Sequence, residues 1–229
     1  MRLKFDHPGD GDDENYSLHF DGDNDYVLTP VSYTDLYGAE TVSISASINW
    51  LSSDSDGGTS SQGIINNASS GSGMGHQIAL NIDTDIGGTG TGYNKLSIWW
   101  EDESDFGNPA MEFSVFDAQF IEYGYWYNIR VELSNNFVYW YLDDQLIETD
   151  EVTFTTLSYY SEGSVPDLNI GRGNDLYDTY FNGYIDNVEI SINSDQLIGS
   201  WSFNEGTGNM TADISGNENH GTINGATWS

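Results

Sequence analysis

Strict alternation of apolar and polar side chains over residues 41–50 constrains the fold of this chain more than any other feature. The apolar positions are Val42, Ile44, Ala46, Ile48 and Trp50, and the polar ones are Thr41, Ser43, Ser45, Ser47 and Asn49. A period of two predicts a β-strand with one face in the core and an outer face of small polar groups. Residues 125–133 repeat the pattern, and residues 137–142 return as another strand after a turn at Asn135 and Asn136.

Signals for further strands are spread along the chain, whereas signals for helices are almost missing. They fall at residues 16–20, 25–28, 63–66, 77–82, 95–100, 111–116, 145–148, 167–170, 183–192 and 199–203. Short strands separated by Gly-, Ser- and Asp-rich loops predict an all-β fold, an antiparallel sandwich or jelly roll. A length of 229 residues favours one such domain.

The charge balance excludes several classes of partner. The chain has 37 Asp and Glu residues against 5 Lys and Arg residues, a formal net charge of −32. No nucleic acid is expected as a partner because no basic stripe exists to neutralise phosphates. No membrane insertion is expected either, because no apolar run approaches about 18 residues. Such a surface is typical of acidic, marine or halophilic proteins, and its oxygens also suit calcium.

Four segments carry a resemblance to one family. Residues 17–27 read SLHFDGDNDYV, residues 181–190 read FNGYIDNVEI, residues 201–206 read WSFNEG, and residues 213–228 contain DISGNENHG. Together with the hairpin at 126–144, they resemble the signature segments of laminin G-like domains of the concanavalin A-like lectin and glucanase class. The resemblance implies a jelly-roll sandwich of two antiparallel sheets.

The order of these segments predicts the domain organisation. Residues 1–15 are interpreted as an acidic flexible tail and residues 16–229 as a single laminin G-like jelly roll. In many relatives the WSFNEG-type segment comes before the FDG-type segment, whereas here it comes last. Residues 198–229 therefore either complete this sheet from the C-terminal side, the interpretation that we favour, or belong to a following repeat.

The resemblance also implies a function. We expect a non-catalytic recognition module at an extracellular, cell or virion surface, although the first residues lack the apolar region of a signal peptide. Its expected partner is carbohydrate or a cell-surface glycan, with structural calcium as cofactor and neighbouring repeats of a larger protein as further partners. A glycan hydrolase or lyase on the same fold, and a structural or adhesion module that binds protein, remain as alternatives.

The expected calcium site combines two distant segments. In similar jelly rolls a structural calcium ion links the first strand region to the closing strand, which implies Asp21, Asp25 and Asp186 as ligands. The DGDND run is no EF-hand loop, because Tyr26 stands where glycine is required and Ser32 where glutamate is required. The alternative is that Asp21 and Asp25 cap a turn. A second metal site in residues 213–219 is a further alternative to a hydrogen-bonded loop.

Catalytic patterns are broken or missing in the sequence. Related glucanases place E-x-D-x-x-E on one strand, and the nearest match, residues 184–189, has Tyr184 in place of the nucleophilic glutamate. The four histidines show no metal-pair spacing, and no G-x-S-x-G elbow is present. The sequence therefore argues against a glucanase-type enzyme, while a Tyr/His pair assembled in space remains open.

Aromatic and polar side chains mark a candidate ligand surface. Sugars stack their C–H faces on aromatic rings and bond their hydroxyls to amides and charged groups. The outer face of residues 125–133 carries such a mixture in Trp126, Asn128 and Arg130. Adjacent Trp99 and Trp100 must point to opposite faces, and Trp100 is named as the fourth ligand residue. The alternative is that these rings are core residues.

Overall fold

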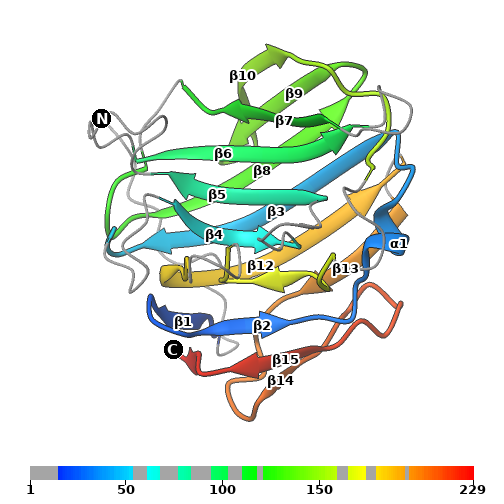
Figure 1. Cartoon of the computed structure of the whole chain (residues 1–229). Coiled ribbons are helices and arrows are strands. Elements are labelled where there is room, and N and C mark those ends of the chain that lie inside the picture. Colours follow the sequence, from blue (N-terminus) through cyan, green and yellow to red (C-terminus); the bar gives the residue numbers. More distant parts are fainter. Residues whose placement is uncertain are drawn as a thin grey trace.

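The computed structural model describes residues 15–53, 61–67, 77–83, 94–102, 110–117, 121–158, 165–173, 179–193 and 196–229. Residues 1–14 of the expected acidic tail lie outside the described residues. Nearly all the regular structure consists of strands, which form two packed antiparallel sheets (Figure 1). The predicted all-β sandwich is therefore confirmed.

The first sheet is built around the alternating strand of the sequence. Its order is β10-β9-β8-β3-β12-β1-β16, and β13 also pairs with β12. The strands are β1 (Leu18–Asp21), β3 (Thr41–Trp50), β8 (Trp126–Ser134), β9 (Phe137–Leu142), β10 (Gln145–Glu151), β12 (Asn182–Ile192), β13 (Gln196–Trp201) and β16 (Thr227–Trp228). The bounds predicted for β3 are confirmed, and β3 lies in the middle of the sheet between β8 and β12.

The second sheet has the order β14-β15-β2-β11-β4-β5-β6-β7. Its strands are β2 (Tyr26–Leu28), β4 (Ser61–Asn66), β5 (Ile78–Asp83), β6 (Lys95–Asp102), β7 (Ala110–Val115), β11 (Asn169–Ile170), β14 (Met210–Thr211) and β15 (Gly221–Asn224). The helix α1 (Tyr33–Leu36) is a single turn, and the carboxylate of Asp35 accepts a hydrogen bond from the Ser32 N–H in a capping box.

The core fills the space between the two sheets. On β3 every apolar side chain of the alternation is buried, and four tryptophans, Trp50, Trp100, Trp140 and Trp201, have at most 1% of their surface exposed. Rings of this size dominate the area removed from water. Because one face of each sheet is fixed in the core, the register of β3 directs its serines to the opposite, outer face.

The C-terminal segment pairs with both sheets. β1 lies along the first half of β12 and β13 along the second half, on the same edge of that strand. β15 pairs with β2 in the other sheet, and β16 pairs with β1. Trp201 and Phe203 are fully buried. Strand pairing and burial thus tie residues 196–229 to the sandwich.

Candidate functional site

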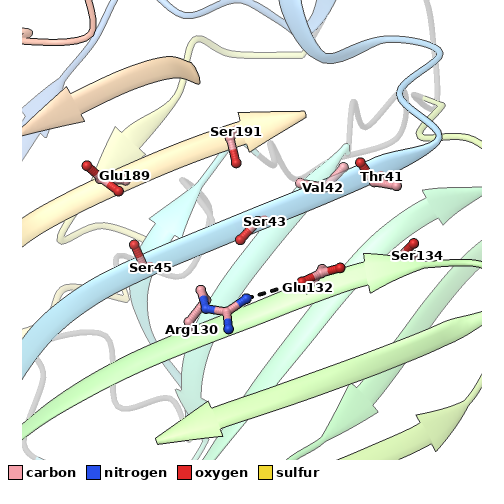
Figure 2. Close-up of a pocket in the computed structure, with 9 residues that line it drawn as sticks. All are labelled: Thr41, Val42, Ser43, Ser45, Arg130, Glu132, Ser134, Glu189 and Ser191. Atoms are coloured by element: carbon pink, nitrogen blue, oxygen red, sulfur yellow. Dashed lines mark hydrogen bonds and ion pairs between the residues drawn. The ribbon is translucent and has the colours of Figure 1, made fainter. Parts of the chain in front are cut away.

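A trough runs along β3 on the outer face of the first sheet. Its floor consists of the short polar side chains of β3: Thr41, Ser43, Ser45, Ser47 and Asn49. Longer side chains stand on the neighbouring strands, Arg130 and Glu132 on β8 and Glu189 on β12 (Figure 2). Two strand spacings of about 4.8 Å separate these walls, so the difference in side-chain length creates a hollow about 10 Å wide.

One end of the trough forms a pocket of about 530 Å³. Eight of its nine lining residues are polar or charged: Thr41, Ser43, Ser45, Arg130, Glu132, Ser134, Glu189 and Ser191, with Val42 as the ninth. This volume lies within the range of small-molecule sites, but such sites are mostly apolar. The lining here suits a ligand rich in hydroxyl groups instead.

Arg130 is held in place by two neighbours. Its Nη1 donates a hydrogen bond to Glu132 Oε2 at 3.1 Å. Its guanidinium carbon lies 3.4 Å from the centroid of the Tyr141 ring on β9, a close cation–π contact. Tyr141 faces outward because it pairs with Arg130 across the two strands. One face and one edge of the guanidinium are therefore occupied by the protein itself.

The other end of the trough is aromatic. Trp126 on β8 and Tyr184 on β12 flank Asn49 and approach to 6.2 Å between ring centroids. His19 on β1 continues the row, 4.8 Å from Tyr184. The Oδ1 atom of Asn49 is buried and has no hydrogen-bond partner among the described residues.

Asn128 lies between the aromatic end and the pocket. Its Oδ1 accepts a hydrogen bond from the Ser47 hydroxyl at 2.7 Å, and the Asn128 side chain is otherwise exposed. Three of the four expected ligand residues, Trp126, Asn128 and Arg130, thus lie on one face along β8. Tyr184, Tyr141 and Asn49 were not expected at this face. Tyr184 and Asn49 reach it only through the pairing of distant strands, whereas Tyr141 comes from the neighbouring hairpin strand β9.

The expected position of Trp100 needs correction. Trp100 has 1% of its surface exposed and packs in the core, where it meets Phe154 edge to face. The outward ring of the pair is Trp99, which stacks on Phe113 of β7 at 4.7 Å. The prediction that the two rings point to opposite faces is correct, but Trp99, and not Trp100, is the ring that points outward.

The expected calcium ligands do not all converge. Asp21 and Asp25 are neighbours, since Asp25 Oδ2 accepts a hydrogen bond from the Asp21 N–H at 3.0 Å. Burial raises the pKa of Asp25, and the charge of Asp21 adds to the rise. Asp21, however, pairs with Asn182 on β12, and Asp186 lies four residues farther along, roughly 13 Å at about 3.3 Å per residue.

The carboxylate of Asp186 is already hydrogen-bonded within the protein. It is fully buried, and its two oxygens accept hydrogen bonds from the backbone N–H and the side-chain amide of Asn187, both at 2.8 Å. Its position coincides with an irregularity in the β3–β12 pairing, where Asn187 adopts a positive φ of 48°. One ion cannot coordinate Asp21 and Asp186 together, so the set of three carboxylates does not fit calcium.

The second candidate metal loop is also closed by hydrogen bonds. Asp213 accepts hydrogen bonds from the N–H groups of Ser200, Ser215 and Asn219 and from the Ser215 hydroxyl. Burial alone would raise the pKa of Asp213, but these hydrogen bonds together lower it below its usual range. Within the described ranges, no group of three or more His, Asp or Glu side chains is placed to hold a metal ion.

Two carboxyl groups with strongly raised pKa values lie far apart in the fold. Burial raises the pKa of Glu101 to about 7 and that of Asp186 to about 7. Glu101 belongs to β6 in the second sheet and Asp186 to β12 in the first sheet. They therefore do not form the facing carboxylate pair of a glycosidase.

Comparisons with known proteins identify the fold. No family model and no curated protein matches the chain. Among solved structures, the CBM40 domain of a Ruminococcus gnavus IT-sialidase matches 78% of this chain and 92% of its own length, with a TM-score of 0.51 at 14% identity. The chain has the concanavalin A-like, laminin G-like jelly-roll fold.

Two further solved structures are similar at lower TM-scores. Domains LG4-5 of the mouse laminin alpha1 chain are 17% identical over 86% of this chain, with a TM-score of 0.49, and the chain spans only 46% of that structure. The binding domain of botulinum neurotoxin serotype G is 13% identical, over 70% of this jelly roll and 35% of the toxin domain, with a TM-score of 0.45.

In the part of this jelly roll that the structure describes, no helix is long and apolar enough to cross a membrane.

Proposed function

We propose that this jelly roll is a carbohydrate-recognition module that binds glycans in the trough along β3. The observation that carries the proposal is the combination, on one face, of the Trp126–Tyr184–His19 aromatic row with a floor of hydroxyl groups. Aromatic faces accept the C–H faces of sugars, and serine hydroxyls both donate and accept hydrogen bonds. We place the module outside the cell or at a cell or virion surface.

The dimensions of the trough favour an oligosaccharide over a single sugar. Trp126 and Arg130 are four residues apart on β8, roughly 13 Å along the strand at about 3.3 Å per residue. A ligand that touches both the aromatic row and the pocket must be extended. Asn128 lies between these two ends, and its exposed side-chain amide is open to a ligand on the way, while the buried Ser47 hydroxyl holds it in place.

Binding to a glycan array and calorimetric titration of its hits test this proposal. Trp126→Ala should weaken glycan binding at least tenfold, about 1.4 kcal/mol, because it removes one stacking face. Trp99→Ala is the matched control, since it deletes a partly exposed ring from the outer face of the other sheet. Equal losses from both variants, or no glycan bound by the wild type, would contradict the proposal. Shortened glycans after incubation would favour the hydrolase or lyase alternative.

Structural calcium is proposed only for the Asp21–Asp25 loop. The two neighbouring carboxylates and the raised pKa of Asp25 support a cation there, since an ion would relieve their repulsion. Millimolar calcium should then raise the melting temperature more than magnesium at the same ionic strength. Asp25→Asn should remove the difference and Asp186→Asn should keep it. Equal effects of both metals on the wild type would remove calcium from the proposal.

A further inference from the structure

We infer that the trough selects glycans without carboxylate or sulfate groups, and that Glu132 enforces this selection. The inference rests on the proposed function and specifies the class of ligand. It starts from the charged side chains of the pocket: one guanidinium, Arg130, and two carboxylates, Glu132 and Glu189. Hydrogen bonds or ring contacts within the protein hold each of these three groups in position.

Arg130 is only partly available as a receptor for an acidic sugar. Arginine recognises carboxylates and sulfates through paired N–H donors in the plane of the guanidinium. In this pocket Glu132 accepts from Nη1 at 3.1 Å, and the Tyr141 ring covers one face of the group at 3.4 Å. An incoming anion that bound the remaining N–H donors would lie beside the carboxylate of Glu132, which already neutralises part of the guanidinium charge.

Glu189 adds a second negative charge on the opposite wall. It stands on β12 in register with Ser45 and Arg130, and its Oε1 accepts a hydrogen bond from Ser200 at 3.0 Å (Figure 2). Over a trough about 10 Å wide, a ligand on the floor lies within one screening length of both glutamates at physiological salt, about 8 Å. An anionic sugar is therefore repelled from two sides.

The same groups suit an uncharged sugar. Sugar hydroxyls can donate to the carboxylates of Glu132 and Glu189 and exchange hydrogen bonds with the hydroxyls of Ser43 and Ser45. Hydrogen bonds to ionised acceptors are stronger than those between neutral groups. The glutamates thus attract hydroxyl-bearing ligands and reject acidic ones, which is how a repulsive element sets specificity.

Oligogalacturonides and their fully methyl-esterified forms provide a matched pair of probes, because the sugar chain is the same and only the charge differs. Calorimetry on the full chain would compare both probes, alongside neutral cello-, manno- and galacto-oligosaccharides from the same panel. We expect the wild type to bind at least one uncharged probe and to bind the charged oligogalacturonide at least tenfold more weakly than its ester.

Glu132→Gln should raise the affinity for the charged probe at least tenfold, because it frees Arg130 and removes one repelling charge. The affinity for uncharged probes should fall rather than rise, because the substitution removes an ionised acceptor for sugar hydroxyls. Glu151→Gln, at the exposed end of β10, makes the same change in net charge away from the trough and should change neither affinity. Glu189→Gln is the second variant if Glu132→Gln fails to fold, and it should shift affinity in the same direction.

The outcomes separate the two claims. Equal or tighter binding of the charged probe by the wild type, or no gain for it in Glu132→Gln and Glu189→Gln, overturns the selectivity and leaves glycan binding standing. Absence of binding to every probe by the wild type and the variants overturns the proposed function and the selectivity with it.

Discussion

Glu101 shows how much a single residue can depend on its surroundings. Its side chain has 1% of its surface exposed, and its Oε2 has no hydrogen-bond partner among the described residues. Burial raises its pKa to about 7. A buried carboxylate without partners is costly, so the folded state favours the protonated form.

Glu101 should therefore make the stability of the protein fall with rising pH. Its folded pKa lies above the unfolded value, so the penalty is absent below about pH 4.5 and is fully present above about pH 7. Glu101→Gln should raise the free energy of unfolding at pH 8 by about 1–3 kcal/mol and change it little at pH 4.5. Urea unfolding at the two pH values measures this, and the same effect at both would contradict it.

At the scale of strands, the C-terminal segment is fastened to the sheet by a network around Asp213. The Asp213 carboxylate accepts a hydrogen bond from the N–H of Ser200 on β13. The side-chain amides of Asn217 and Asn219 donate hydrogen bonds to the carbonyl of Ile198. The Trp201 indole donates to the Asn219 carbonyl at 2.8 Å. The loop and β13 therefore hold each other in place.

Asp213→Ala should lower the free energy of unfolding by about 3 kcal/mol, because it leaves one buried and two partly buried N–H groups without an acceptor. Asp167→Ala removes an exposed carboxylate and is the control. Urea titration followed by tryptophan fluorescence measures both.

A chain ended after Ile192 should aggregate, because β12 would lose its β13 partner. A soluble truncated chain with unchanged stability would assign residues 198–229 to a following repeat.

Local patterns predicted the strands better than the way they come together. The alternation of β3 set its bounds correctly because one face is buried and the other is not. The strand expected at residues 199–203 instead ends at Trp201, since Phe203 has a positive φ of 48°. Trp99 and Trp100 were interchanged because β6 is largely buried on both faces, which leaves no alternation to read.

Long-range pairing decided the candidate site. Trp126, Asn128 and Arg130 were predictable as one outer face because they alternate on a single strand. Tyr184 and Glu189 join them only because β12 lies beside β3, about 140 residues away in the chain, a neighbour that no local pattern encodes. The pairing of β1 with β12 separates Asp186 from Asp21, which the family resemblance had implied to be close.

At the scale of the whole molecule, the net charge of −32 acts against compactness. Screening should relieve this self-repulsion, so the melting temperature should rise by roughly 3–8 °C between about 10 mM and 1 M sodium chloride, a gain of about 1–2 kcal/mol. EDTA in all samples excludes divalent cations, and potassium chloride should act equally. A flat or falling curve by differential scanning calorimetry would contradict the halophilic interpretation.

The reciprocal hydrogen bonds between Ser17 and Ser229, both at 3.0 Å, have a consequence for engineering. They bring two points more than 200 residues apart in sequence to neighbouring positions on one sheet. A short linker between them would allow the gene to be circularly permuted, with new ends opened at the Asn135–Asn136 turn between β8 and β9. Such a permutant should keep every strand pair, and its new ends would lie beside Ser134 at the pocket end of the trough.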